Sequence, residues 1–158
     1  MRPRIRRSTV VLGACILAVV SSTRWVRVNV SPSVPLGLYA LTPVTLPLAH
    51  GMLAVLTVPA SMQRWHVGYA PLLKPIVGLP GDTVCYQEHG LFVNRVAFGL
   101  VYETVQGEPL PHIVEGCQVV QPGQVFLASH MPRSLDGRYF GPVLVADLTA
   151  LALPLFTW

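Results

Sequence analysis

The sequence has little charge, and the charge it has is concentrated at one end. Charged residues make up 11% of the 158 residues, against about 25% in typical soluble domains. Of the 11 basic residues, four are arginines within the first seven positions, which leaves 7 basic and 7 acidic residues in positions 8–158. Because a nucleic-acid-binding fold needs a basic patch or stripe, this neutral body argues against nucleic acid as a partner.

Long helical stretches are also missing, since 15 prolines and 13 glycines are scattered through the chain. This spacing favours short strands joined by turns, and an apolar content of 52% excludes a disordered chain. Residues 61–67 fit one or two helical turns, and Pro80-Gly81 fits the centre of a type II turn. We therefore expect an all-β domain, with strands at 25–30, 38–41, 53–58, 72–77, 83–86, 91–93, 96–98, 119–120 and 124–128.

Only one apolar run is long enough to suggest export or membrane attachment. Residues 10–20 are continuously apolar, and the uncharged stretch around them spans residues 8–23. A membrane helix needs about 20 residues, whereas runs of 10–14 suit the core of a signal peptide. We predict that residues 1–24 form a signal peptide or a short membrane anchor, with a buried core helix as the alternative. The arginines before the run predict that residues 25–158 face away from the cytoplasm.

Cysteines are few, and no motif for a metal or a thioredoxin-like site is present. The sequence contains neither C-x-x-C nor H-E-x-x-H. Cys15 lies in the apolar run, so that Cys85 and Cys117 remain as a candidate disulfide. In an oxidising compartment this bridge would add roughly 3 kcal/mol of stability. The alternative is that both residues are small buried hydrophobes.

The chain has a single lysine, Lys74, and it lies in an apolar stretch where an exposed lysine is not expected. In a strand its side chain would share a face with Leu72 and Ile76, and Pro75 favours an extended backbone at Lys74. Burial disfavours the ammonium ion and lowers the pKa of the lysine, so a neutral amine would be available as a general base. The alternative is an edge-strand lysine whose ammonium group reaches solvent.

Two serines, Ser31 and Ser33, lie in a loop rich in proline and glycine over residues 29–39. A rigid loop is a good support for a reactive hydroxyl. Ser33 is therefore a candidate nucleophile, and the Ser31 hydroxyl is a candidate stabiliser of the oxyanion. An ordinary turn is the alternative. A Ser-His-Asp triad is disfavoured because the sequence has no G-x-S-x-G elbow.

A third polar block begins at Ser134 and contains Asp136, one of only three aspartates in the chain, and Arg138. An aspartate and an arginine two residues apart can brace a loop, and a serine hydroxyl can orient an amine by hydrogen bonding. Taken alone, the block would be interpreted as a solvated surface turn.

In chain order, the three blocks resemble the motifs of the bacterial signal peptidase I (S26) family. The segments Ser31-x-Ser33-x-Pro35, Lys74-Pro-Ile-Val-Gly-Leu-Pro-Gly-Asp82 and Ser134-x-Asp-x-Arg-Tyr-Phe-Gly141 are similar to its serine, lysine and Asp–Arg boxes. The extension of the first segment to Gly-Leu-Tyr at 37–39 is most similar to the TraF branch of conjugative-transfer signal peptidases. The resemblance covers about residues 29–143.

This resemblance implies a signal-peptidase-like antiparallel β-sheet catalytic domain over residues 25–158, preceded by one N-terminal hydrophobic helix. It implies a serine–lysine dyad in which Ser33 is the nucleophile and Lys74 the general base. Asp136 matches an aspartate that is treated as catalytically required in the TraF branch.

Three further matches have supporting roles in the family. Ser31 is similar to the serine that stabilises the oxyanion, Ser134 to the serine that orients the lysine, and Arg138 to the partner of the aspartate. Gly137 stands where the family has serine, which changes the loop but not the reacting groups. The chemistry of the family requires no metal and no organic cofactor.

The resemblance implies a membrane-attached serine endopeptidase that processes exported precursors. Its TraF branch favours the maturation, with or without cyclisation, of a conjugative pilin in a plasmid transfer system. We expect a prepilin or another signal-peptide-bearing precursor as the partner, and attachment to the cytoplasmic membrane with the catalytic domain in the periplasm. One alternative is a general signal peptidase I, and another is a non-catalytic, membrane-anchored assembly protein of a transfer apparatus.

Overall fold

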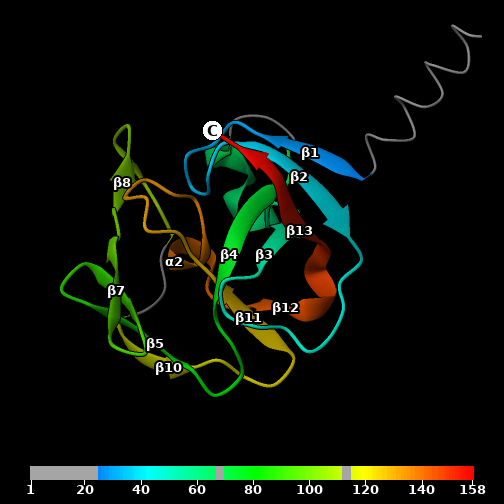
Figure 1. Cartoon of the computed structure of the whole chain (residues 1–158). Coiled ribbons are helices and arrows are strands. Elements are labelled where there is room, and N and C mark those ends of the chain that lie inside the picture. The colour runs from blue at the N-terminus through cyan, green and yellow to red at the C-terminus, as the bar shows by residue number, and fades with distance from the viewer. Residues whose placement is uncertain (1–24, 67–69, 112–114) are drawn as a thin grey trace, which may run out of the picture.

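The structure, a computed structural model, describes residues 25–66, 70–111 and 115–158. It is built mainly of antiparallel β-strands with a few short helices (Figure 1), as the sequence predicts. The predicted signal peptide or anchor at residues 1–24 lies outside the described residues. Among the described residues, no helix combines the length and the apolar character needed to cross a membrane.

A seven-stranded antiparallel sheet forms the larger part of the fold, in the strand order β1-β2-β13-β3-β4-β11-β12. The last strand of the chain lies in the middle of this sheet, between β2 and β3 (Figure 1). Its strands are β1 (Val26–Asn29), β2 (Gly37–Thr42), β3 (Leu53–Leu56), β4 (Leu72–Gly78), β11 (Gln124–Leu127), β12 (Val143–Leu144) and β13 (Leu148–Thr157).

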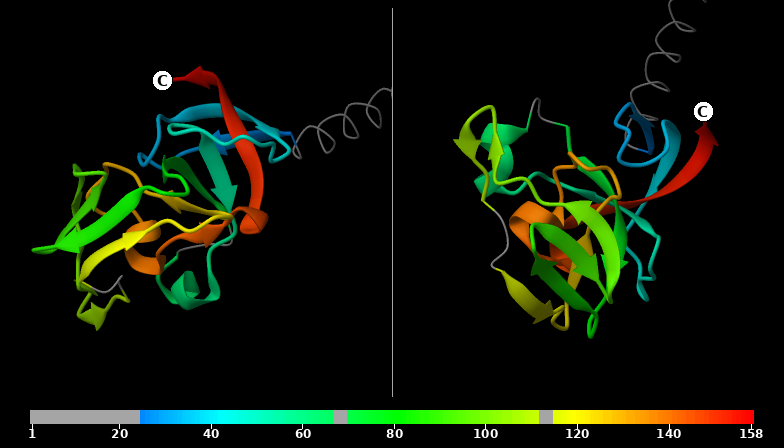
Figure 2. Two further views of the ribbon diagram at one scale, coloured as in Figure 1. Left: turned by 90° about the horizontal axis from the view of Figure 1, so that it is seen from below. Right: turned by 90° about the vertical axis from the view of Figure 1, so that its left-hand side faces the viewer.

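A four-stranded sheet in the order β10-β5-β6-β7 lies beside the large sheet (Figure 2). Its strands are β5 (Thr83–Gln87), β6 (Gly90–Val93), β7 (Val96–Leu100) and β10 (Gly116–Val119). The remaining elements are short: the strand pair β8 (Thr104–Val105) and β9 (Glu108–Pro109), and the helices η1 (Ala60–Trp65), α2 (Gly137–Phe140) and η2 (Val145–Asp147).

Adjacent residues of β11 face two different apolar clusters. Phe126 packs with side chains of the four-stranded sheet and with Tyr139 of α2, whereas Leu127 packs with Ile76 of β4 and side chains of β3 and β13. Successive side chains of a strand point to opposite faces, so β11 separates the two cores. Burial of each large side chain contributes about 1.5–3 kcal/mol. The polar segment that follows β11 therefore starts from a strand fixed on both faces.

A third apolar cluster lies between the candidate serine loop and the candidate lysine strand. Val34, which follows Ser33, is buried in the same cluster as Leu73, which precedes Lys74. Tyr39 of β2 belongs to this cluster and is fully buried. Packing therefore fixes the backbone next to both candidate reacting residues.

Each predicted strand overlaps a strand of the structure, and the predicted turn at Pro80-Gly81 is confirmed. Gly81 has a φ of 95°, and the Asp82 N–H donates a hydrogen bond to the Leu79 carbonyl at 2.9 Å. A type II turn needs a positive φ at this position, which glycine adopts without strain.

The ten-residue strand β13, the longest in the described chain, was not expected from the sequence. Its run of apolar residues does not alternate, and Pro154 lacks the N–H that a central strand uses in the sheet. In the structure β13 pairs with β3 only up to Ala152, while Pro154 faces β2 alone, next to a register shift. The proline is thus tolerated because one side of β13 is already free there.

Cys85 of β5 lies directly opposite Cys117 of β10, and a disulfide joins them. β10 is exposed along its whole length and pairs only with β5. The disulfide therefore supports a strand that has little core packing of its own.

We predict that a Cys85→Ser/Cys117→Ser double variant loses about 3 kcal/mol of unfolding free energy, because the unfolded chain regains the entropy of the closed loop. Urea denaturation of the oxidised wild type and the variant measures this loss. Cys15→Ser is the matched control, since it removes a thiol that takes no part in the bridge. A double variant as stable as the control would contradict the prediction.

Candidate functional site

The loop that carries Ser31 and Ser33 is held by the side chain of Asn29, a buried residue at the end of β1. The Asn29 amide nitrogen lies 2.8–3.1 Å from the backbone carbonyls of Ser31, Val34 and Pro35. Its Oδ1 accepts a hydrogen bond from the Ser31 N–H at 3.2 Å. One buried amide thereby satisfies several backbone groups of a turn that has no sheet partners of its own.

A second side chain, that of Tyr39, also holds the loop at Pro35. The hydroxyl of the fully buried Tyr39 donates a hydrogen bond to the Pro35 carbonyl at 2.6 Å. Within this frame the Ser31 and Ser33 hydroxyl oxygens lie 3.0 Å apart, within hydrogen-bond distance. Ser31 is exposed and Ser33 is half-buried, so both hydroxyls are available at the surface of a rigid loop.

Lys74 is buried in β4, with 4% of its surface exposed. Burial lowers its pKa from 10.5 to about 8, while the nearby Asp136 carboxylate raises the pKa and the Arg138 guanidinium lowers it. The Lys74 ammonium nitrogen donates a hydrogen bond to the Ser134 hydroxyl at 2.8 Å. A lysine with this pKa is partly neutral near neutral pH and can accept a proton.

Asp136 and Arg138 form an ion pair with no exposed surface, at 2.8 Å between Oδ1 and Nε. Asp136 also accepts hydrogen bonds from the backbone N–H of Arg138, where it caps α2, and from that of Ser129. The Arg138 guanidinium donates to four further backbone carbonyls, those of Phe98, Leu100, Ser129 and Pro132. A buried charge is costly unless it is paired and hydrogen-bonded. Asp136 and Arg138 meet both conditions.

These contacts indicate that Asp136 supports the site from within the protein, since it is enclosed and its oxygens are occupied. The pair joins the segment 129–138 to β7, because two of the four carbonyls belong to that strand. Arg138 therefore fixes the position of Ser134, which holds the lysine.

The three polar blocks of the sequence converge in the structure. The Ser129 hydroxyl donates a hydrogen bond to the Ser33 carbonyl at 2.7 Å, and the Ala128 N–H donates to the Pro75 carbonyl at 3.3 Å. Among the described residues, Lys74 is hydrogen-bonded to Ser134 and not to Ser33. Catalytic hydrogen bonds are often long or unformed without a substrate.

Sequence reasoning did not assign a function to Asn29, Tyr39 or Ser129. Asn29 and Tyr39 flank the serine loop. An asparagine before a turn commonly forms hydrogen bonds from its side chain to the backbone, so the role of Asn29 could have been predicted from the sequence. The contact of Ser129 with the serine loop had no such signal, because Ser33 lies 96 residues away in the sequence.

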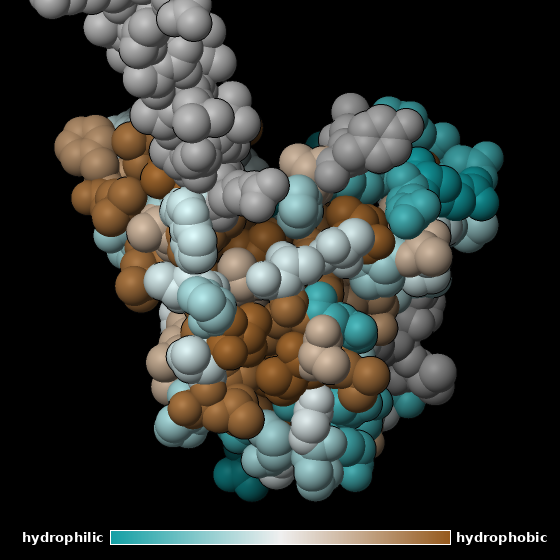
Figure 3. Space-filling view, turned by 90° about the vertical axis from the view of Figure 1, so that its right-hand side faces the viewer, coloured by the Kyte–Doolittle hydropathy of each residue, from teal (hydrophilic) through white to brown (hydrophobic). Residues whose placement is uncertain are grey.

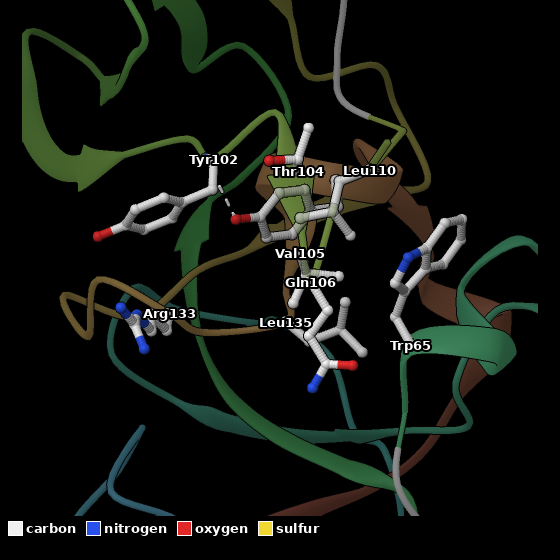
Figure 4. Close-up of a pocket in the computed structure, with 9 residues that line it drawn as sticks. Trp65, Tyr102, Thr104, Val105, Gln106, Leu110, Arg133 and Leu135 are labelled. Carbon is white, nitrogen blue, oxygen red and sulfur yellow. Dashed lines mark hydrogen bonds between the residues drawn. The ribbon is translucent and has the colours of Figure 1, made fainter. Parts of the chain in front are cut away.

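A hollow of about 380 Å³ adjoins the segment that holds Ser134. Figure 4 shows Trp65 and Tyr102 on opposite sides of it, with Leu135 between them. Arg133 and Leu135, the neighbours of Ser134 in the chain, both line it.

Within residues 25–66, 70–111 and 115–158, no group of three or more metal-ligating side chains is gathered in one place.

A family model described as signal peptidase, peptidase S26, matches residues 4–157. The chain belongs to the peptidase S26 family. The S26 resemblance seen in the three sequence blocks is therefore confirmed.

Relatives of this S26 protein include conjugal transfer proteins. It is 32% identical over 145 residues to conjugal transfer protein TraF of Agrobacterium tumefaciens, covering 84% of this chain and 82% of that protein. It is 26% identical to plasmid transfer protein TraF of Escherichia coli, covering 98% and 97% of the two chains. Signal peptidase I of Enterococcus faecalis aligns with a TM-score of 0.41 at 21% identity, over 68% of this chain and 98% of that chain.

We predict that Asp136→Asn costs about 3–5 kcal/mol of unfolding free energy, because it leaves the Arg138 cation buried without its counter-charge. Urea denaturation at neutral pH measures the change. Asp147→Asn is the control, since Asp147 is exposed at the surface and its neutralisation should change stability by less than about 0.5 kcal/mol. Equal stability of the two variants would show that the ion pair is not buried as described.

Proposed function

We propose that the protein is a membrane-attached serine endopeptidase in which Ser33 is the nucleophile and Lys74 the general base. One observation carries the proposal: the only lysine of the chain is buried and its pKa is lowered to about 8. The segment that holds this lysine through Ser134 also holds the backbone carbonyl of Ser33 through Ser129. Membership of the S26 family supports it further.

In the proposed reaction, neutral Lys74 accepts the proton of the Ser33 hydroxyl as Oγ attacks the scissile carbonyl carbon. The Ser31 hydroxyl, 3.0 Å from Ser33 Oγ, and a backbone N–H stabilise the resulting oxyanion. The C–N bond then breaks, and Lys74 returns the proton to the leaving amine. In this reaction the Ser33 hydroxyl exchanges its contact with Ser31 for one with Lys74, while Ser134 keeps the amine in place.

The acyl-enzyme has two possible fates, and they define the product. Attack by water releases a free carboxylate, whereas attack by the amino terminus of the same substrate forms an amide bond and closes a ring. Both steps free the Ser33 hydroxyl and need no metal or organic cofactor. Exclusion of water from the site favours ring closure.

A conjugative prepilin is the proposed substrate, because the relatives described above are transfer proteins. A general signal peptidase I would use the same residues on many precursors. It would cleave an Ala-x-Ala reporter precursor as well as a pilin. A non-catalytic assembly protein of the transfer apparatus would be unaffected by loss of Ser33.

We propose that the domain lies against the cytoplasmic membrane, on its periplasmic side. Figure 3 shows hydrophobic residues gathered on the face that carries β1, β2 and β13. Exposed apolar side chains are concentrated around β1 and the end of β13, namely Trp25, Val28, Val30, Leu155, Phe156 and Trp158. Exposed apolar surface of this kind marks sites of contact with membranes or proteins, and tryptophan suits the membrane interface.

Ser33→Ala and Lys74→Arg are each expected to lower cleavage of a co-expressed prepilin by at least about 1,000-fold, because the nucleophile or the neutral base is lost. Intact-mass spectrometry of the pilin measures the product. A mass lower by one water than that of the linear cleaved pilin identifies a cyclic product. Ser61→Ala, which removes an exposed hydroxyl on η1, is the control. Unchanged processing by the Ser33→Ala variant would favour the non-catalytic alternative.

The rate of cleavage should rise with pH and level off above about 8, because only the neutral form of Lys74 accepts a proton. Below the pKa, kcat/KM should fall about tenfold for each pH unit. A pH profile with a soluble peptide substrate between about pH 6 and pH 10 tests this. A rate that is flat or falls across that range would exclude a lysine base.

A further inference from the structure

Ser129, the second residue after β11, uses every polar group that it has. It is 3% exposed. Its backbone N–H donates to Asp136 Oδ2 at 3.0 Å, and its carbonyl accepts from the Arg138 guanidinium at 2.5 Å. Its hydroxyl donates to the Ser33 carbonyl at 2.7 Å and accepts from the Met131 N–H at 3.1 Å.

The two backbone hydrogen bonds tie Ser129 to both members of the buried ion pair. That pair has no exposed surface, so it cannot shift without leaving buried charges unpaired, which costs several kcal/mol. The Ser129 hydroxyl is therefore held at a fixed point. Hydrogen bonds to charged groups are also about twice as strong as neutral ones.

The carbonyl that Ser129 holds is bonded to the α-carbon of the candidate nucleophile. Within the described chain, this is the one side-chain hydrogen bond that the Ser33 carbonyl accepts. The same segment holds Lys74 through Ser134. The segment that contains Ser129 and Ser134 therefore holds both the backbone of Ser33 and the amine of Lys74. The contact between Ser129 and Ser33 spans 96 residues of sequence.

We propose that Ser129 is the positioning residue that couples the buried Asp136–Arg138 pair to the nucleophile loop. The proposal rests on the proposed function, since it takes Ser33 as the nucleophile. Ser129 acts through Ser33 and does not contact the reacting atoms. A displacement of about 1 Å in a reacting group can cost 100-fold in rate, so the loss of one anchoring bond is expected to appear in turnover.

The test compares Ser129→Ala with Ser129→Thr, which keeps the hydroxyl. Ser129→Ala is expected to lower kcat by about 10- to 100-fold, to leave KM within about twofold, and to leave the ionisation near pH 8 in place, because no charge near Lys74 changes. Ser129→Thr is expected to recover most of the lost kcat. If the alanine variant does not fold, Ser129→Cys replaces it, since a thiol is a weak donor of similar size.

Thr149→Val is the matched control. Thr149 makes the same kind of hydrogen bond, from its hydroxyl to the backbone carbonyl of Val55 at 3.1 Å, on β13 and β3. Its loss should leave kcat unchanged. A Ser129→Ala variant with the kcat of Thr149→Val, or with a kcat that threonine does not rescue, would overturn the proposal.

Hydrogen-exchange mass spectrometry gives a second measurement that does not depend on activity. The backbone amides of residues 30–37 should exchange faster in Ser129→Ala than in the wild type or Thr149→Val. If wild type and Ser33→Ala are equally inactive, the proposed function has failed, and the exchange rates alone decide whether Ser129 holds the loop. Unchanged exchange in Ser129→Ala would overturn the coupling even in an active enzyme.

Discussion

The buried ion pair between Asp136 and Arg138 is the interaction on which the site depends. Two opposite charges with no exposed surface are stable only with all their hydrogen bonds made, and here the partners come from β7, α2 and the segment after β11. The pair therefore fixes several elements relative to one another. Its neighbours Ser129 and Ser134 extend this rigidity to the serine loop and to the lysine.

The same arrangement explains how the pKa of one lysine is lowered far enough for a fraction of the amine to be neutral near neutral pH. Burial lowers the pKa of Lys74, the Arg138 guanidinium lowers it further, and the Asp136 carboxylate opposes this shift. Because Asp136 is already engaged by Arg138, the lysine receives no direct carboxylate partner among the described contacts and instead hydrogen-bonds a neutral hydroxyl. A direct ion pair would favour the ammonium form, so the position of Ser134 preserves the basicity that the proposed chemistry needs.

The sequence predicted the polar blocks and most strands because those signals are local. A lone lysine in an apolar run and two serines between prolines are visible without any contact map. Strand β13 was missed since its tolerance for Pro154 depends on which side of the strand is paired. Ser129 was missed for a similar reason, because its partner Ser33 lies 96 residues away. Both features depend on contacts between residues that are distant in the sequence, which local patterns do not predict.

Direct titration of Lys74 tests the central claim most directly. The chain contains one lysine, so lysine-selective isotope labelling gives a single side-chain signal whose chemical shift follows the amine through its ionisation. We predict a midpoint near 8, lowered chiefly by burial of the amine. A midpoint near the ordinary value of 10.5 would show that the amine is solvated and has almost no neutral form at neutral pH, and would contradict a lysine base in this site.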